Sequence, residues 1–156
     1  MTKNAFITWG GWDGHEPEQT AAIFAEVLRT EGYQVEVSNA LDAFEDQAFT
    51  NSQDLIVPVW TMAGISREQE TGLLQAIRAG TGCAGWHGGM ADSFRQNVEY
   101  QFMVGGQFIC HPGGVIDYEV NITSADPIVS GLSDFTMHSE QYFMHVDPSN
   151  EVLATT

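Results

Sequence analysis

Short apolar runs that alternate with helix-like segments are the feature that most limits how this chain can fold. The runs predicted as buried strands are residues 5–9, 33–37, 54–60 and 83–86. After the first run, Pro17 opens a segment with helical spacing that ends at Gly32. Before the last run, Ser66 and Gln69 form a capping box for a helix that ends at Gly80. This alternation predicts an α/β fold with a mostly parallel, doubly wound sheet.

The last of these runs leads into a glycine-rich turn. Residues 85–89 read Gly-Trp-His-Gly-Gly, the spacing of a sharp strand-to-helix elbow, with His87 where a serine or cysteine would attack. Such an elbow holds its central residue in a strained conformation at the ligand-binding edge of a parallel sheet, and a helix over 91–100 is expected to follow. An imidazole there favours proton transfer or metal binding over acyl transfer. Cys83 lies inside the strand, so glutamine amidotransferase chemistry is excluded.

The bulk composition limits the partners. A chain of 156 residues fits one domain, and 21 acidic against 5 basic residues give a net charge of −16. Such a surface repels nucleic acid and anionic lipid. No apolar stretch is long enough for a membrane span or a signal peptide, so we expect a cytoplasmic protein. Cys83 and Cys110 both lie in apolar runs and are expected to be buried, reduced thiols.

Four of the five histidines follow strand-like runs and have glycine or proline nearby, as functional loop residues often do. His15 follows the first strand and His87 the fourth, and the carboxyl ends of parallel strands share one edge, so the two side chains are expected to approach each other. His111 and His145 follow later strand-like runs. The alternatives that remain are a helix-entry or surface histidine for His15, a polar cap of the following helix for His87, and a structural histidine for His111. For His145 the structural role is favoured over a site role. His138 is given no role.

Several polar and aromatic residues near these histidines are candidates for ligand contacts. Glu140 is a candidate acid or an orienter of histidine. Trp60 is expected to be core, and Asp92 is a loop acid without discriminating context. The expected substrate-binding residues are Trp12, Asp13, Trp86, Gly88, Gln141, Tyr142 and His145.

The motifs together resemble one family. They are residues 10–15, the 85–89 elbow, residues 105–112, residues 126–132 and residues 139–142. In order and spacing they resemble the ThuA-like (trehalose utilisation) family over essentially the whole chain. The resemblance implies a single domain over 1–156 with the flavodoxin-like three-layer sandwich of class I glutamine amidotransferase domains, without the catalytic cysteine. Family members commonly continue further, so a C-terminal strand and loop are expected to be missing here.

The resemblance also implies a carbohydrate partner. It points to processing of a disaccharide or 3-keto-glycoside by hydrolysis or isomerisation, with His87 as base, His111 or His15 polarising the ketone, and Glu140 orienting a histidine or donating a proton. A divalent metal, zinc or manganese, would be bound by His15, His87, His111 and Glu140, although tight His-x-x-x-His spacing is absent. The alternative is a non-catalytic sugar-binding or regulatory module.

A third hypothesis is a subunit-contact role. It places the exposed aromatic residues Phe102, Phe108 and Tyr118 in a homo-oligomer interface.

Overall fold

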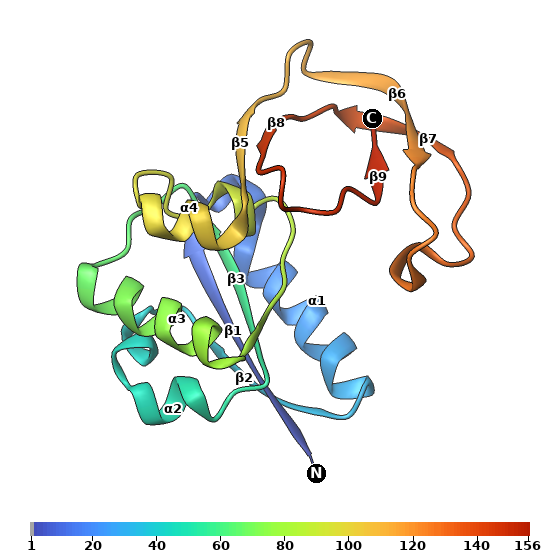
Figure 1. Ribbon diagram of the computed structural model, residues 1–156. Helices are drawn as coiled ribbons and strands as arrows, with labels where there is room; N and C mark the ends of the chain where they lie inside the picture. Colours follow the sequence, from blue (N-terminus) through green and yellow to red (C-terminus); the bar gives the residue numbers. More distant parts are fainter. Residues whose placement is uncertain (1) are drawn as a thin grey trace. The chain divides into compact units, whose positions relative to one another are not determined.

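The computed structural model describes residues 2–156 (Figure 1). They form two compact units, one up to Val104 and one from Gly105 to Thr156. Within the described residues, none of the helices is long and apolar enough to cross a membrane.

The first unit is a parallel sheet with helices on both faces. Its strands are β1 (Lys3–Gly11), β2 (Tyr33–Ser38), β3 (Leu55–Thr61) and β4 (Gly82–Cys83), in the order β2-β1-β3-β4. Its α-helices are α1 (Pro17–Thr30), α2 (Gln47–Asn51), α3 (Arg67–Ala79) and α4 (Val98–Val104), and its 3₁₀ turns are η1 (Asp13–His15), η2 (Asp42–Glu45) and η3 (Met90–Asp92). All three strand pairings are parallel. The expected flavodoxin-like α/β sandwich with a doubly wound sheet is confirmed.

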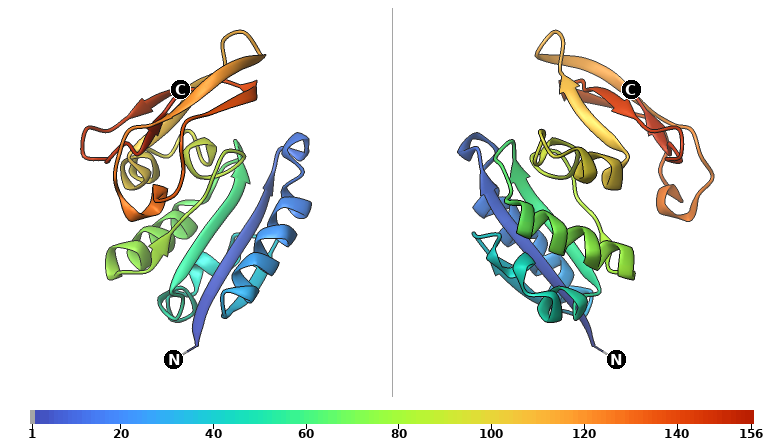
Figure 2. Two further views of the ribbon diagram at one scale, coloured as in Figure 1. Left: turned by 90° about the vertical axis from the view of Figure 1, so that its right-hand side faces the viewer. Right: turned by 60° about the vertical axis from the view of Figure 1, so that its left-hand side comes forward.

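The core lies on both faces of this sheet because successive strand residues point to opposite sides. Phe6 packs with Phe44 and Leu73 on the face covered by α2 and α3 (Figure 2). Its neighbour Ile7 packs with Ala21 of α1 on the other face. All five side chains are fully buried.

The predicted helix boundaries are confirmed where a capping residue, a proline or a glycine marks the end of the helix. Pro17 is at the first turn of α1. The capping box of Ser66 and Gln69 is present at the start of α3, and Gly80 caps the end of that helix.

The second unit is antiparallel. Its elements are β5 (Gly106–Cys110), β6 (Val115–Ile122), η4 (Pro127–Val129), β7 (Phe135–Glu140), β8 (Phe143–Val146) and β9 (Ala154–Thr155). β5 pairs with β8, and β6 lies between β7 and β9 (Figure 1).

Three sequence-based expectations are wrong. β4 ends at Cys83 instead of residue 86, because it is an edge strand that pairs only with β3. The helix expected over 91–100 is split, because Phe94 has a left-handed φ of 47° that a helix cannot contain. Cys110 is exposed instead of buried, because the two-stranded β5–β8 sheet does not cover it.

Candidate functional site

The sheet topology of the first unit gathers three chemically active side chains. His15 ends η1, directly after β1. His87 lies in the loop between β4 and η3, and Asp92 ends η3. Because the strands are parallel, these loops meet at the carboxyl edge of the sheet, where open α/β sheets bind ligands. The structure therefore brings His15 and His87 together.

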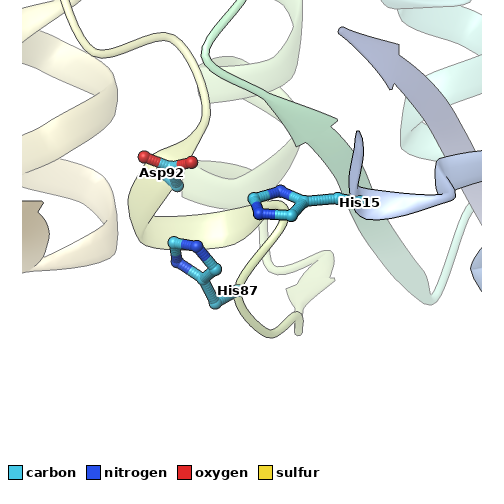
Figure 3. Close-up of side chains that lie close together, drawn as sticks. All are labelled: His15, His87 and Asp92. Atoms are coloured by element: carbon cyan, nitrogen blue, oxygen red, sulfur yellow. The ribbon is translucent and has the colours of Figure 1, made fainter. Parts of the chain in front are cut away.

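Figure 3 shows the three side chains converging. Each of the three offers one ligand atom, and these atoms all lie within 4.8 Å of one another. The rings of His15 and His87 meet edge to face, with centroids 4.9 Å apart. Both histidines are half-buried, whereas Asp92 is only 1% exposed. The cluster thus has two solvent-accessible imidazoles and one buried carboxylate.

Asp92 has one oxygen in use and one without a partner. Its Oδ1 accepts a hydrogen bond from Arg95 Nε at 2.6 Å and is also paired with Arg95 Nη2. Its Oδ2 is buried and has no hydrogen-bond partner among residues 2–156. A buried carboxylate oxygen without a protein partner is costly, so this atom is suited to bind a cation or a water molecule.

Backbone hydrogen bonds fix Asp92 in place. Its N–H donates to Gly89 O at 2.9 Å, and its carbonyl accepts from Met62 N at 3.1 Å. Met62 directly follows β3, so the loop that contains Asp92 is attached to the end of a central strand.

A buried hydroxyl joins the other two loops. Thr61, the last residue of β3, is fully buried. Its Oγ1 lies 3.0 Å from His15 Nδ1 and donates to Gly88 O at 2.7 Å. One side chain therefore connects the segment after β1 with the loop after β4.

Backbone strain is concentrated around these residues. Among the described residues, four other than glycine have left-handed φ angles: Glu16 (48°), Met62 (60°), Met90 (42°) and Phe94 (47°). Glu16 follows His15, Met62 follows Thr61, and the other two flank Asp92 at two residues on either side. Such conformations cost on the order of 1–3 kcal/mol each and cluster at functional sites.

The elbow differs from its predicted form. The left-handed residue of the 85–89 turn is Gly88, with φ 50°, and not His87. A Cβ at Gly88 would lie 2.8 Å from His15 Nδ1, so the turn needs glycine there both for its backbone angle and for the approach of the His15 ring. The strain predicted for His87 is therefore absent, because the left-handed position of the turn is occupied by a glycine, which adopts it without strain.

The second unit contains a separate group of predicted site residues. His111 Nε2 lies 3.6 Å from Glu140 Oε1, and both side chains are partly exposed. The His111 ring stacks on Phe108, and Tyr142 meets Phe108 edge to face. His15 and His87 lie in the first unit, so the joint four-residue site stays a prediction.

Other predicted residues lie as follows. His145 is exposed on β8, Asp13 is exposed in η1, and Gln141 is half-buried. His138, which was given no role, has its Nδ1 2.7 Å from Asp117 Oδ1 on the surface.

The tryptophans near the strand ends differ in how far their rings are exposed to solvent. Trp12 is 53% exposed, and the centroid of its ring lies 4.7 Å from the centroid of the His15 ring. Trp86 stacks on Phe24 with centroids 3.8 Å apart, so one face of its indole is already covered. Trp60 packs against the core, as expected.

The aromatic residues proposed for an oligomer interface also divide. Phe102 is 73% exposed, but Phe108 is buried and Tyr118 is half-buried. Phe108 is therefore unsuited to the contact proposed for it, because it packs among side chains of its own unit.

The two thiols are expected to react at very different rates. Burial raises the pKa of Cys83 to about 11, and its Sγ lies 3.9 Å from Met90 Sδ under the site loop. Only about one Cys83 thiol in a thousand is then ionised at pH 8, and the thiolate is the reactive form. Iodoacetamide at pH 8, followed by peptide mass spectrometry, should label the exposed Cys110 first. Equal rates in the folded protein would contradict this, and guanidinium should equalise them.

The donor set of the first unit suits a divalent metal. Two imidazole nitrogens and a carboxylate oxygen form a common three-ligand set for catalytic zinc, and manganese accepts the same donors. The Asp92 oxygen without a partner provides an anionic ligand, and the fixed loops hold the three residues close together.

Comparisons with known proteins agree with this fold. A family model described as ThuA, trehalose utilisation, matches residues 4–156. A crystal structure at 2.30 Å of a protein from Bacteroides uniformis ATCC 8492, described as ThuA-like, superposes with a TM-score of 0.79 at 17% identity, covering 98% of this chain and 67% of that one. At that identity the likeness establishes the fold alone. No curated protein matches this chain.

Proposed function

We propose, from the premise that this chain belongs to the ThuA (trehalose utilisation) family, that it processes a disaccharide or its 3-keto derivative at the site formed by His15, His87 and Asp92. The observation that supports this most directly is the convergence of two imidazoles and a buried carboxylate within 4.8 Å at the carboxyl edge of the sheet. A strongly acidic chain suits a neutral sugar better than a phosphorylated one.

The chemistry follows from the acidity that a ketone gives to its neighbours. A keto group at ring carbon 3 makes the C2–H bond acidic, and an imidazole near neutrality can remove that proton. The electron pair moves through the enolate and expels the glycosidic oxygen from C1, which takes up a proton as it leaves. Water then adds across the C1–C2 double bond, so the net reaction is hydrolysis.

The residues take roles that match their positions. His87 is the proposed base because it is half-buried and accessible. His15, beside it, is the proposed group that polarises the ketone oxygen, which it would do as the imidazolium, with a proton on both ring nitrogens. Asp92 lies within 4.8 Å of a ring nitrogen of each histidine, and its carboxylate is the proposed group that stabilises the imidazolium that forms.

A divalent metal is the second form of the same proposal. His15, His87 and Asp92 would hold zinc or manganese, which would supply a Lewis acid for the ketone oxygen when bound. This set shares two residues with the predicted ligands and replaces His111 and Glu140 with Asp92.

One observation favours a non-catalytic alternative. The exposed Trp12 indole beside His15 offers a flat apolar surface on which a sugar ring can stack. A module that binds sugars without changing them would use the same edge of the sheet.

The test follows turnover and binding in parallel. The protein is treated with EDTA and assayed by ¹H NMR with trehalose and 3-keto-trehalose, alone and with added Zn²⁺ or Mn²⁺. We expect cleavage of the keto-disaccharide into two monosaccharides in at least one metal state. Calorimetric binding of either sugar without product in every state would overturn the enzymatic proposal in favour of the binding module.

A further inference from the structure

We infer that Thr61 is a positioning residue that fixes the tautomer of His15. In the neutral ring, its hydroxyl holds the proton on Nδ1 and leaves Nε2 unprotonated toward His87 and Asp92. The assignment of the tautomer depends only on the contacts of His15 and Thr61. The importance of that tautomer for turnover depends on the proposed function.

The protons available around Thr61 decide the direction of both of its side-chain hydrogen bonds. A threonine hydroxyl has one proton to donate, and a backbone carbonyl can only accept. Thr61 Oγ1 lies 2.7 Å from Gly88 O, so its proton is committed to that carbonyl. The 3.0 Å contact between Thr61 Oγ1 and His15 Nδ1 is then a hydrogen bond only if Nδ1 is the donor. In the neutral imidazole the proton therefore lies on Nδ1, and the lone pair lies on Nε2.

Two residues cover the Nδ1 edge of the His15 ring. Thr61 is fully buried, so solvent does not compete for its proton or its lone pairs. Gly88 packs directly on the Nδ1 side of the ring, where an added Cβ would come within 2.8 Å of Nδ1 and 2.9 Å of Cβ. The Nδ1 edge is thus enclosed by Thr61 and Gly88.

The opposite edge of the ring faces the cluster. Figure 3 shows the far end of the His15 ring directed toward His87 and Asp92. A lone pair on Nε2 can accept a proton or bind a metal ion, whereas an N–H in that place can do neither. The Thr61 hydroxyl therefore determines whether Nε2 faces His87 and Asp92 with a lone pair or with an N–H group.

The same residue also couples two loops. Besides its side-chain contacts, the Thr61 carbonyl accepts a hydrogen bond from Trp12 N at 3.2 Å. The end of β3 thereby fixes both the segment that contains His15 and the loop that contains His87. Outer residues that orient a ligating histidine in this way typically change metal affinity about tenfold to a hundredfold when mutated.

The test reads the tautomer directly by NMR. Long-range ¹H–¹⁵N spectra of ¹⁵N-labelled full-length protein, recorded at alkaline pH where imidazoles are neutral, distinguish protonated from unprotonated ring nitrogens. The His15 signals are those absent from His15→Ala. We expect a protonated Nδ1 and an unprotonated Nε2 in the unmodified protein. A proton on Nε2 in the unmodified protein would overturn the inference.

Two variants test the cause. Thr61→Val keeps the shape but removes the hydroxyl, and it should shift the His15 proton toward Nε2 and weaken Zn²⁺ binding about tenfold or more. Thr61→Ser keeps the hydroxyl and should restore both readouts. An unchanged His15 spectrum in Thr61→Val would overturn the role of Thr61. Because neither readout requires turnover, failure of the sugar assay would leave this result standing.

Discussion

Replacing His87 with alanine is expected to lower cleavage of a 3-keto-disaccharide about a thousandfold while leaving the protein folded. A positioned general base contributes roughly 10²–10⁴ to rate, and the same imidazole is one of three ligand atoms within 4.8 Å in the metal-assisted form. His87 is half-buried in a loop that is neither helix nor strand, so its loss removes little packed surface. The measurement is the initial rate by NMR, with the urea unfolding midpoint recorded in parallel.

His138→Ala is the matched control. That imidazole also pairs with a carboxylate, Asp117, but on the exposed surface of the second unit. It should retain full rate and full stability. Full activity in His87→Ala would remove His87 from the mechanism, and a lowered unfolding midpoint would assign it a structural role instead.

The sequence predicted best those helices and strands whose ends are set by interactions among neighbouring residues. Helix α3 could be predicted at both ends because its capping box and its terminal glycine are interactions among neighbouring residues. The approach of His15 and His87 could be predicted because parallel strands place their carboxyl ends at one edge. Where pairing is between distant segments, as in the antiparallel sheets of the second unit, the sequence predicted strand-like runs before His111 and His145 but neither their pairing nor β7 and β9.

The two residues that complete the site could not be recognised from the sequence. Asp92 was one loop acid among several, and only its spacing of three residues from Arg95 hinted at a buried pair. Thr61 was the last residue of an apolar strand, and its role depends on Gly88, which is 27 residues away. In both, the contacts that matter are made across loops whose course depends on strained φ angles, which residue patterns do not reveal.

Replacing Gly72 with alanine is expected to destabilise the protein, although the same change stabilises most helices. In an exposed helix interior, alanine is favoured over glycine by about 1 kcal/mol. Gly72 is buried in α3 where the helix packs directly on η2, and an added Cβ would lie 1.7 Å from the carbonyl oxygen of Phe44. That oxygen belongs to backbone and cannot rotate away, so α3 must move.

The movement would disturb a closely packed face of the core. Phe44 and Leu73 are both fully buried there, beside Phe6 of the central strand. Overpacking costs about 1–3 kcal/mol, and a clash between two backbones belongs at the upper end of that range. Urea denaturation should show a loss of about 3 kcal/mol. Gln75→Ala, on the exposed side of the same helix, should stay within about 0.5 kcal/mol. A Gly72→Ala protein as stable as the original would mean that α3 lies further from η2 than the structure has it.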